Sequence, residues 1–155
     1  MTLEVIFEFH STSLDNEAGV ASGWSDPPLS AKGRAVAKEL GERRQGEQID
    51  AVFCSDLRRA IETAEIAFGK RIPIHADHRL REYDHGTMTG TPVERIHAER
   101  PAGVDSPFPD GESLREVAKR VRDSSPNLLA TGTVSESPSF ATAPQSLRSI
   151  TCSPE

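Results

Sequence analysis

A chain of 155 residues with 18 basic and 24 acidic side chains carries a formal net charge of −6 and has a pI near 5.4. This charge offers no broad cationic surface, so neither nucleic acid nor a membrane is expected as a partner. Cys54 and Cys152 are too few for a disulfide framework, and residues 1–9 lack the parts of a signal peptide, so we expect a cytoplasmic protein of one-domain size.

The first predicted element is a strand at residues 3–9, which is rich in β-branched and aromatic side chains and stops at His10. Residues 11–30 are dense in Ser, Asp, Asn, Gly and Pro, a composition typical of a long functional loop. A histidine at the end of a buried strand is well placed to attack a ligand. By position alone, however, a purely structural role for His10 is the commoner outcome.

The middle of the sequence alternates predicted strands and helices. In chain order we expect a helix at 31–44 capped by Ser30, a strand at 49–54, a helix at 57–68 capped by Ser55 and Asp56, a strand at 72–75, and helices at 92–99 and 112–122. The alternation predicts a three-layer α/β/α fold, a mostly parallel sheet with helices on both faces. Ligands bind such sheets beyond the carboxyl ends of the strands, where His10 and Ser55 both lie.

Two groups of polar side chains are candidates for phosphate chemistry. Arginines in the first turn of the helix at 57–68 lie beside exposed N–H groups and the positive end of the helix dipole, although solvated arginines on an amphipathic helix are the alternative. Glu82 lies in a glycine-containing segment, where a carboxylic acid can protonate a leaving alcohol, or where it can be part of an acidic surface loop. His75 and His78 would point to opposite faces of an extended segment, so no metal site is expected there.

Residues 124–155 differ from the rest in composition. They hold three charged side chains and are crowded with Ser, Thr, Pro and Ala, without helical or strand periodicity. Such a composition is typical of disorder. We therefore expect an incomplete α/β domain at residues 1–123 and a low-complexity, disordered tail at residues 124–155.

The order of the motifs resembles the histidine phosphatase superfamily, the phosphoglycerate-mutase-like enzymes. The matching pieces are a strand ending in His10, Asn16 six residues later, G-W-x-D-x-P-L-S-x-x-G at 23–33, S-D-L-x-R-A-x-x-T-A at 55–64, L-R-E-x-x-x-G-x-x-x-G at 80–90 and G-E-S at 111–113. The resemblance covers about residues 5–122. It implies the phosphoglycerate-mutase-like α/β fold.

The resemblance also implies a metal-independent and cofactor-free phosphomonoester hydrolase. In that chemistry His10 is the nucleophile that becomes phosphohistidine, Glu82 protonates the leaving oxygen, and Arg59 stabilises the charge on the phosphoryl group. Asn16 and Ser11, together with Arg59, are the expected substrate-binding residues. The substrate would be a phosphorylated small molecule or a phosphoprotein. A phosphoglycerate mutase and an inactive phosphate-binding remnant are the alternatives, and the oligomeric state cannot be predicted.

The motif around the nucleophile departs from the family pattern. The family has Arg-His-Gly, whereas this chain has Phe9, His10 and Ser11. The change removes a bidentate phosphate donor and adds a Cβ where glycine permits close backbone approach. Activity is therefore expected to be impaired unless Arg58 or Arg81 supplies the missing cation.

The second departure lies after residue 122, where the family continues with a strand ending in a second histidine. No histidine follows His97 in this sequence. Reading permitted codons of the tail in another frame yields a strand, a histidine and a helix in the family's order. We therefore interpret the chain as truncated, with a frameshift near Asp123, and expect the loss of that strand to expose an inner edge of the sheet.

Overall fold

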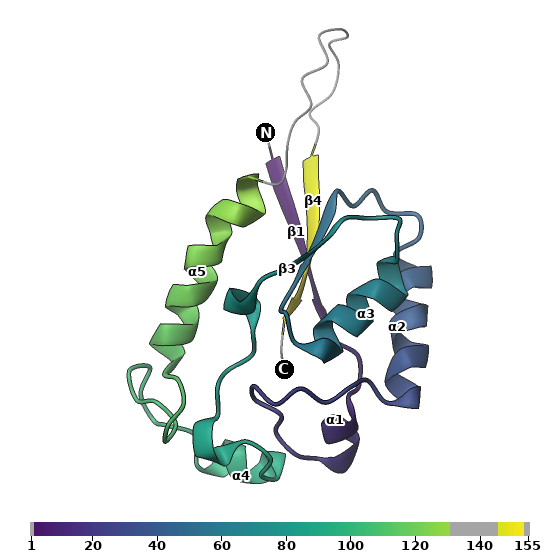
Figure 1. The fold of residues 1–155 in the computed structure, drawn as a ribbon. Coiled ribbons are helices and arrows are strands. Elements are labelled where there is room, and N and C mark those ends of the chain that lie inside the picture. Colours follow the sequence, from purple (N-terminus) through teal and green to yellow (C-terminus); the bar gives the residue numbers. More distant parts are fainter. Residues whose placement is uncertain (1, 131–145, 154–155) are drawn as a thin grey trace, which may run out of the picture.

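The computed structural model describes residues 2–130 and 146–153 (Figure 1). Its elements are β1 (Thr2–Phe9), α1 (Leu14–Ala18), α2 (Ala31–Arg43), β2 (Ala51–Cys54), α3 (Arg58–Phe68), β3 (Ile74–Ala76), the 3-10 helices η1 (His78–Leu80) and η2 (Gly86–Met88), α4 (Val93–Ala98), α5 (Leu114–Ala130) and β4 (Ser146–Ser153). Among these residues, four parallel strands form one sheet in the order β1-β4-β2-β3. No helix in the described ranges is long and apolar enough to cross a membrane.

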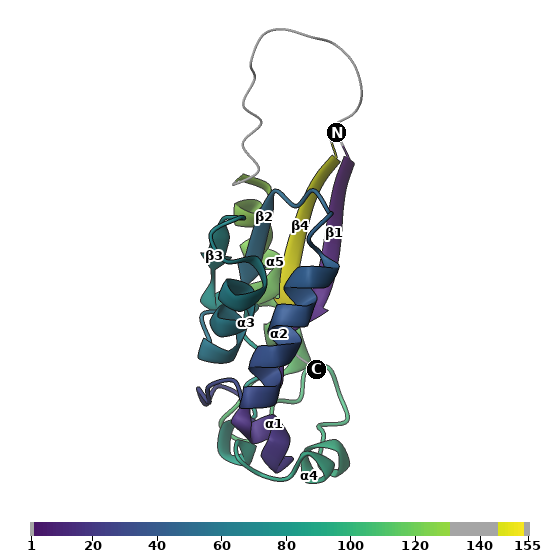
Figure 2. The same cartoon turned by 90° about the vertical axis from the view of Figure 1, so that its right-hand side faces the viewer.

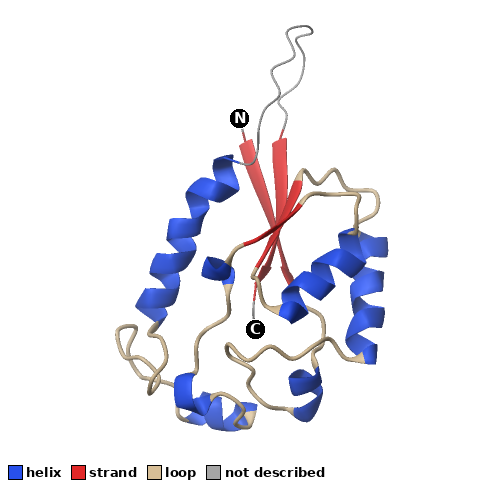
Figure 3. Cartoon of the chain, in the orientation of Figure 1, coloured by secondary structure: helices blue, strands red, loops and turns tan. Residues whose placement is uncertain are grey.

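The sheet lies between two layers of helices. Helices α2 and α3 cover one face and α5 lies over the other, as the two views at right angles show (Figures 1 and 2). The predicted α/β/α class, with helices on both faces of a parallel sheet, is therefore confirmed. Loops, together with α1 and α4, gather beyond the carboxyl ends of the strands (Figure 3). Parallel α/β sheets usually bind their ligands at this end.

The main core lies between the sheet and the layer of α2 and α3. Every residue of β2 is buried, as expected for an inner strand of a parallel sheet. The cluster consists of Leu40, Val52, Cys54, Ala60, Ala64, Ala67 and Phe68. Small side chains let the two helices approach closely: a Cβ on Gly41 would lie 2.3 Å from the carbonyl oxygen of Ala67. The apolar face of α3 therefore fixes how that helix lies on the sheet.

The helix starts test the expected caps. Ser30 caps α2 as predicted, and its hydroxyl accepts a hydrogen bond from the backbone N–H of Gly33 at 3.0 Å. At α3 the prediction is wrong, because the N-cap is Leu57 and makes no side-chain cap bond. Asp26, from the long loop, instead accepts the N–H of Arg58 at 2.6 Å. A carboxylate distant in sequence thus satisfies the helix start.

The long loop after His10 contains an unexpected helix, the five-residue α1. Its start is a capping box, in which Ser13 accepts the N–H of Asn16 and the Asn16 side chain accepts the N–H of Ser13. The two bonds satisfy helix-start donors in both directions. The turn residues of this loop therefore form a defined structure rather than an open connection.

The structure also differs from the expected disordered tail. Helix α5 continues to Ala130, and β4 lies between β1 and β2, with Ser153 beside Phe9 and Cys152 beside Cys54. The expected exposed inner edge is therefore wrong for the described residues. Backbone pairing explains the difference, because a gap between β1 and β2 would leave two rows of unpaired N–H and C=O groups. Residues 131–145 and 154–155 lie outside the described residues, and the domain boundary stays a prediction.

Candidate active site

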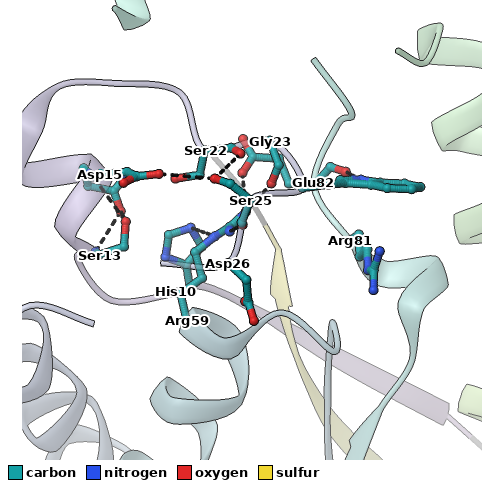
Figure 4. Close-up of polar contacts among 12 residues, drawn as sticks. His10, Ser13, Asp15, Ser22, Gly23, Ser25, Asp26, Arg59, Arg81 and Glu82 are labelled. Atoms are coloured by element: carbon teal, nitrogen blue, oxygen red, sulfur yellow. Dashed lines mark hydrogen bonds and ion pairs between the residues drawn. The ribbon is translucent and has the colours of Figure 1, made fainter. Parts of the chain in front are cut away.

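His10 directly follows β1, and its ring orientation is fixed from both sides. Its Nδ1 lies 2.9 Å from the carbonyl oxygen of Ser11, while Nε2 lies 3.3 Å from Nε of Arg59 (Figure 4). A carbonyl only accepts, so Nδ1 carries the proton, and Nε2 accepts from the guanidinium. The nitrogen of His10 that faces Arg59 is therefore the unprotonated one. A nucleophile that attacks phosphorus needs such an unprotonated nitrogen.

Arg59 lies in the first turn of α3, and its side chain is only 1% exposed. One terminal nitrogen donates to the carbonyl of Ser25 at 2.9 Å, and the other donates to the carbonyl of Gly23 at 2.8 Å and to Oε2 of Glu82 at 2.8 Å. These bonds join α3 to the long loop and to the segment after β3 (Figure 4). The predicted nucleophile, cation and acid therefore meet in one place.

The backbone at Glu82 is held by side chains that the sequence analysis did not single out. The indole N–H of Trp24 and the guanidinium of Arg120 each donate to the carbonyl of Glu82 at 2.8 Å. The guanidinium of Arg120 also lies over the Trp24 ring, 6.0 Å from its centroid. The Glu82 carboxylate is thus aimed at Arg59 from an anchored backbone. Trp24 belongs to the quoted G-W segment, whereas no signal in the sequence marked Arg120.

The expected phosphate-binding residues divide into two kinds. The side-chain oxygen of Asn16 accepts hydrogen bonds from the backbone N–H and the hydroxyl of Ser13, both at 2.9 Å. The side-chain NH2 group of Asn16 is then the part that can donate a hydrogen bond to a ligand. Ser11 is buried and acts through its backbone, because its N–H donates to Oγ1 of Thr63 at 2.9 Å and its carbonyl accepts from His10. These contacts give Ser11 a positioning role, and the substrate contact expected for it stays a prediction.

The cations expected to replace the missing arginine are bound to carboxylates elsewhere. Arg58 pairs with Glu62 at 2.8 Å, and Arg81 makes two bonds of 2.6 Å to Asp56. The hydrogen bonds from Arg81 hold the pKa of the Asp56 carboxyl below its usual range. Phe9, at the arginine's position in the family motif, is 59% exposed. Arg59, in contrast, contacts the ring of His10 directly.

A cavity of about 130 Å³ opens beside this cluster. Its walls are formed by His10, Asn16, Val20, Ala21, Ser22, Glu82, His85, Val93, Ile96, His97 and Arg100. The other histidines lie elsewhere: His75 stacks on Phe53 with ring centroids 5.2 Å apart, and the side chain of His78 is 72% exposed. The cavity therefore joins the predicted nucleophile and acid to the loop and α4.

His85 is a cavity residue that the sequence analysis missed, although it lies in the quoted segment at 80–90. Its ring packs edge-on against Phe108 and Tyr83, with centroids 5.1 Å and 5.8 Å away. Burial lowers the pKa of His85 below its usual value. A neutral imidazole three positions after Glu82 is therefore part of the cavity wall. A histidine so near a candidate acid was the available signal.

The family model of the histidine phosphatase superfamily (branch 1) matches residues 9–133. The chain belongs to this superfamily. A phosphoserine phosphatase 1 of Hydrogenobacter thermophilus is 34% identical over 129 residues, 77% of this chain and 61% of that protein. A 2,3-bisphosphoglycerate-dependent phosphoglycerate mutase of Bifidobacterium longum is 37% identical over 105 residues, 64% of this chain and 43% of that protein. The chain thus spans about three fifths or less of the length of these histidine phosphatases.

The fold agrees with solved structures of the same superfamily. The native structure of a mycobacterial glucosyl-3-phosphoglycerate phosphatase superposes with a TM-score of 0.73 and 27% sequence identity. The match covers 97% of this chain and 73% of that one. The family resemblance and the predicted phosphoglycerate-mutase-like fold are therefore confirmed.

Proposed function

We propose that this chain hydrolyses phosphomonoesters through a phosphohistidine on His10, as a metal-independent histidine phosphatase. The observation that carries the proposal is that Arg59 donates to both Nε2 of His10 and Oε2 of Glu82, at 3.3 Å and 2.8 Å. A nucleophile, a cation and an acid within one set of hydrogen bonds are what phosphoryl transfer requires, since catalysis depends mainly on positioning and charge.

In the first step Nε2 of His10 attacks phosphorus in line with the ester oxygen. The new N–P bond forms as the P–O bond to the alcohol breaks, and the leaving oxygen takes a proton from the carboxylic acid of Glu82. Before this step the phosphoryl oxygens displace the Glu82 carboxylate from Arg59, and the displaced carboxylate takes up from the solvent the proton that it then donates. The amide of Asn16 supplies a further neutral donor.

In the second step water attacks the phosphohistidine. The oxygen of water forms the new P–O bond, the N–P bond returns its electron pair to Nε2, and the Glu82 carboxylate takes the proton from water. Inorganic phosphate leaves, and His10 and Glu82 return to their starting forms. The same carboxyl group thus works as an acid and then as a base.

We propose a phosphorylated small molecule as the substrate and the cytoplasm as the location, with neither nucleic acid nor a membrane as a partner. The phosphoglycerate mutase among the relatives makes phosphoryl return to an acceptor the second candidate. A mutase must keep water from its phosphohistidine. Phe9 stands where the family motif has an arginine, so the phosphoryl group has one fewer charged contact, which favours slow hydrolysis over that transfer.

The test compares phosphate release from p-nitrophenyl phosphate by the wild-type chain, His10→Ala and the exposed-site control His78→Ala. We expect a loss of at least about a hundredfold in the first variant and little change in the second. Acid-labile phosphate trapped on His10 of the wild type would support the covalent route. Equal rates for wild type and His10→Ala would contradict catalysis by His10 and favour an inactive phosphate-binding remnant. Transfer of the phosphoryl group to an added alcohol in place of water would support the mutase.

A further inference from the structure

A closed set of hydrogen bonds joins His10 and Arg59 through Ser11 and Thr63. Nδ1 of His10 donates to the carbonyl of Ser11, and the N–H of Ser11 donates to Oγ1 of Thr63, both at 2.9 Å. The hydroxyl of Thr63 donates to the carbonyl of Arg59 at 2.7 Å, and Nε of that arginine contacts Nε2 of His10 at 3.3 Å (Figure 4). We call this set the hydrogen-bond circuit. It connects the proposed nucleophile and cation twice, once directly and once through Thr63.

The circuit requires one particular tautomer of His10. A carbonyl only accepts a hydrogen bond and a guanidinium only donates one, so both contacts of the imidazole need a proton on Nδ1 and none on Nε2. In a histidine, the partner of one ring nitrogen determines which nitrogen carries the proton. The carbonyl of Ser11 is therefore the group that selects the tautomer in which Nε2 can attack phosphorus.

Thr63 holds the backbone that carries this carbonyl. It lies on α3 and is 0% exposed, and Ser11 is 5% exposed, so water has little access to the bond between them. The hydroxyl gives its one proton to the carbonyl four residues earlier and keeps lone pairs for the N–H of Ser11. The next carbonyl, that of Thr12, accepts the N–H of Ser30 at 3.0 Å. Residues 11–12 are thus tied to α3 and to the start of α2.

The bond from Ser11 separates this arrangement from an ordinary buried threonine. A threonine that only completes its own helix needs just the bond to the carbonyl of Arg59. The N–H of Ser11 instead comes from a residue 52 positions away in the sequence. Valine at position 63 would keep the shape of threonine and place a methyl group against this N–H. A buried donor without an acceptor is unfavourable, so the peptide should turn and take the carbonyl of Ser11 away from Nδ1.

We propose that Thr63 is a positioning residue that keeps the proton of His10 on Nδ1 by holding the backbone of Ser11. Thr63 lies outside the described lining of the cavity, so it acts through His10 and Arg59 and not on the substrate. Its part in catalysis rests on the proposed phosphatase function, because only a reacting His10 needs an unprotonated Nε2. The tautomer itself is a property of the free chain.

The test observes the ring nitrogens of His10 directly, in the neutral imidazole and without substrate. Nitrogen NMR shifts of a histidine-labelled chain distinguish the two tautomers, and the spectrum of His10→Ala identifies the signals of His10. We expect the Nδ1–H form in the wild type and in Thr63→Ser, which keeps the hydroxyl, and a mixture with the Nε2–H form in Thr63→Val. Thr91→Val is the matched control, because its hydroxyl also donates to an earlier carbonyl, that of Met88 at 2.7 Å, outside the circuit.

Formation of phosphohistidine from p-nitrophenyl phosphate is followed in parallel. Thr63→Val should form it at least about tenfold more slowly than the wild type, whereas Thr63→Ser should stay within about threefold. Thr63→Ala removes the hydroxyl without placing a methyl group against Ser11, and it should behave as Thr63→Val does. Measuring both variants keeps the result from depending on whether one of them folds.

An Nε2–H tautomer in the wild type would overturn the proposal, whatever the variants show. So would a folded Thr63→Val or Thr63→Ala that reacts slowly but keeps the Nδ1–H form, because Thr63 would then have a structural role only. Loss of the Nδ1–H form in these variants, in a chain whose wild type forms no phosphohistidine, would contradict the phosphatase function and support the action of Thr63 on His10.

Discussion

Arg59 and Glu82 form an ion pair of 2.8 Å beside His10. Arg59 is therefore neutralised by the residue proposed as the acid. A phosphoryl group that binds Arg59 must displace the carboxylate, whereas the bonds from Arg59 to the carbonyls of Gly23 and Ser25 can persist. In the proposed mechanism substrate binding moves Glu82 from the guanidinium toward the leaving oxygen, so the proposed acid and phosphate-binding roles are coupled.

The first prediction concerns Glu82→Gln and the leaving group. An amide cannot protonate an alcohol, so hydrolysis of an alkyl phosphate should fall by about a hundredfold or more, while p-nitrophenyl phosphate, whose leaving group needs little protonation, should lose much less. Initial rates with both substrates measure the difference. Glu94→Gln, outside the cavity on α4, is the control. An equal loss on both substrates would show that Glu82 acts on Arg59 and not on the leaving oxygen.

The second prediction separates neighbouring arginines. Arg59→Lys should lower kcat/KM by about a hundredfold or more, because one ammonium cannot reproduce the planar donors that contact Ser25, Gly23 and the phosphoryl group. Arg58→Lys should change the rate less than about threefold, because Arg58 is half exposed and paired with Glu62. Similar rates for the two variants would remove Arg59 from the mechanism.

A third prediction follows from the buried imidazole of His85. Burial lowers its pKa, so the unfolded chain binds this proton more readily than the folded chain does. The free energy of unfolding should therefore fall as pH drops below the unfolded value of about 6.5, by at most about 1.4 kcal/mol per pH unit from this group.

Replacing His85 by Phe should remove that part of the pH dependence and preserve the packing on Tyr83 and Phe108. Urea unfolding at several pH values measures this pH dependence of the free energy of unfolding. The variant His97→Gln, at an exposed histidine, is the control. A slope for His85→Phe that matches the wild type would assign the acid sensitivity to other groups.

The fourth prediction tests the contact between α2 and the loop after His10. A Cβ on Gly33 would lie 2.0 Å from the carbonyl oxygen of Thr12, so Gly33→Ala must displace backbone. We expect a loss of about 1–3 kcal/mol in the free energy of unfolding, together with slower catalysis. Gly46→Ala has open space around its Cβ and should change stability by less than about 1 kcal/mol. Equal urea midpoints for the two variants would contradict this close packing.

The sequence by itself determined most of the local structure and the identity of the candidate catalytic residues. Helical spacing and Ser30 predicted α2, the apolar run before His10 predicted β1, and the ordered motifs identified the superfamily and selected His10, Arg59 and Glu82. These signals are short in range, since helix caps, strand alternation and motif spacing act within a few residues. They can be recognised without knowing how distant segments meet.

Only the tertiary structure decided which distant groups share a bond. Asp26 caps α3 in place of the expected local residues, and Arg120 holds the carbonyl of Glu82 from 38 positions away. Strand β4 pairs with β1 and β2 through backbone donors and acceptors. Every non-proline residue carries both groups, so the composition of the segment did not predict this pairing. The ion pair between Arg59 and Glu82 could not be predicted either. Long-range contacts depend on how the whole chain packs, and the spacing of residues in the sequence does not encode them.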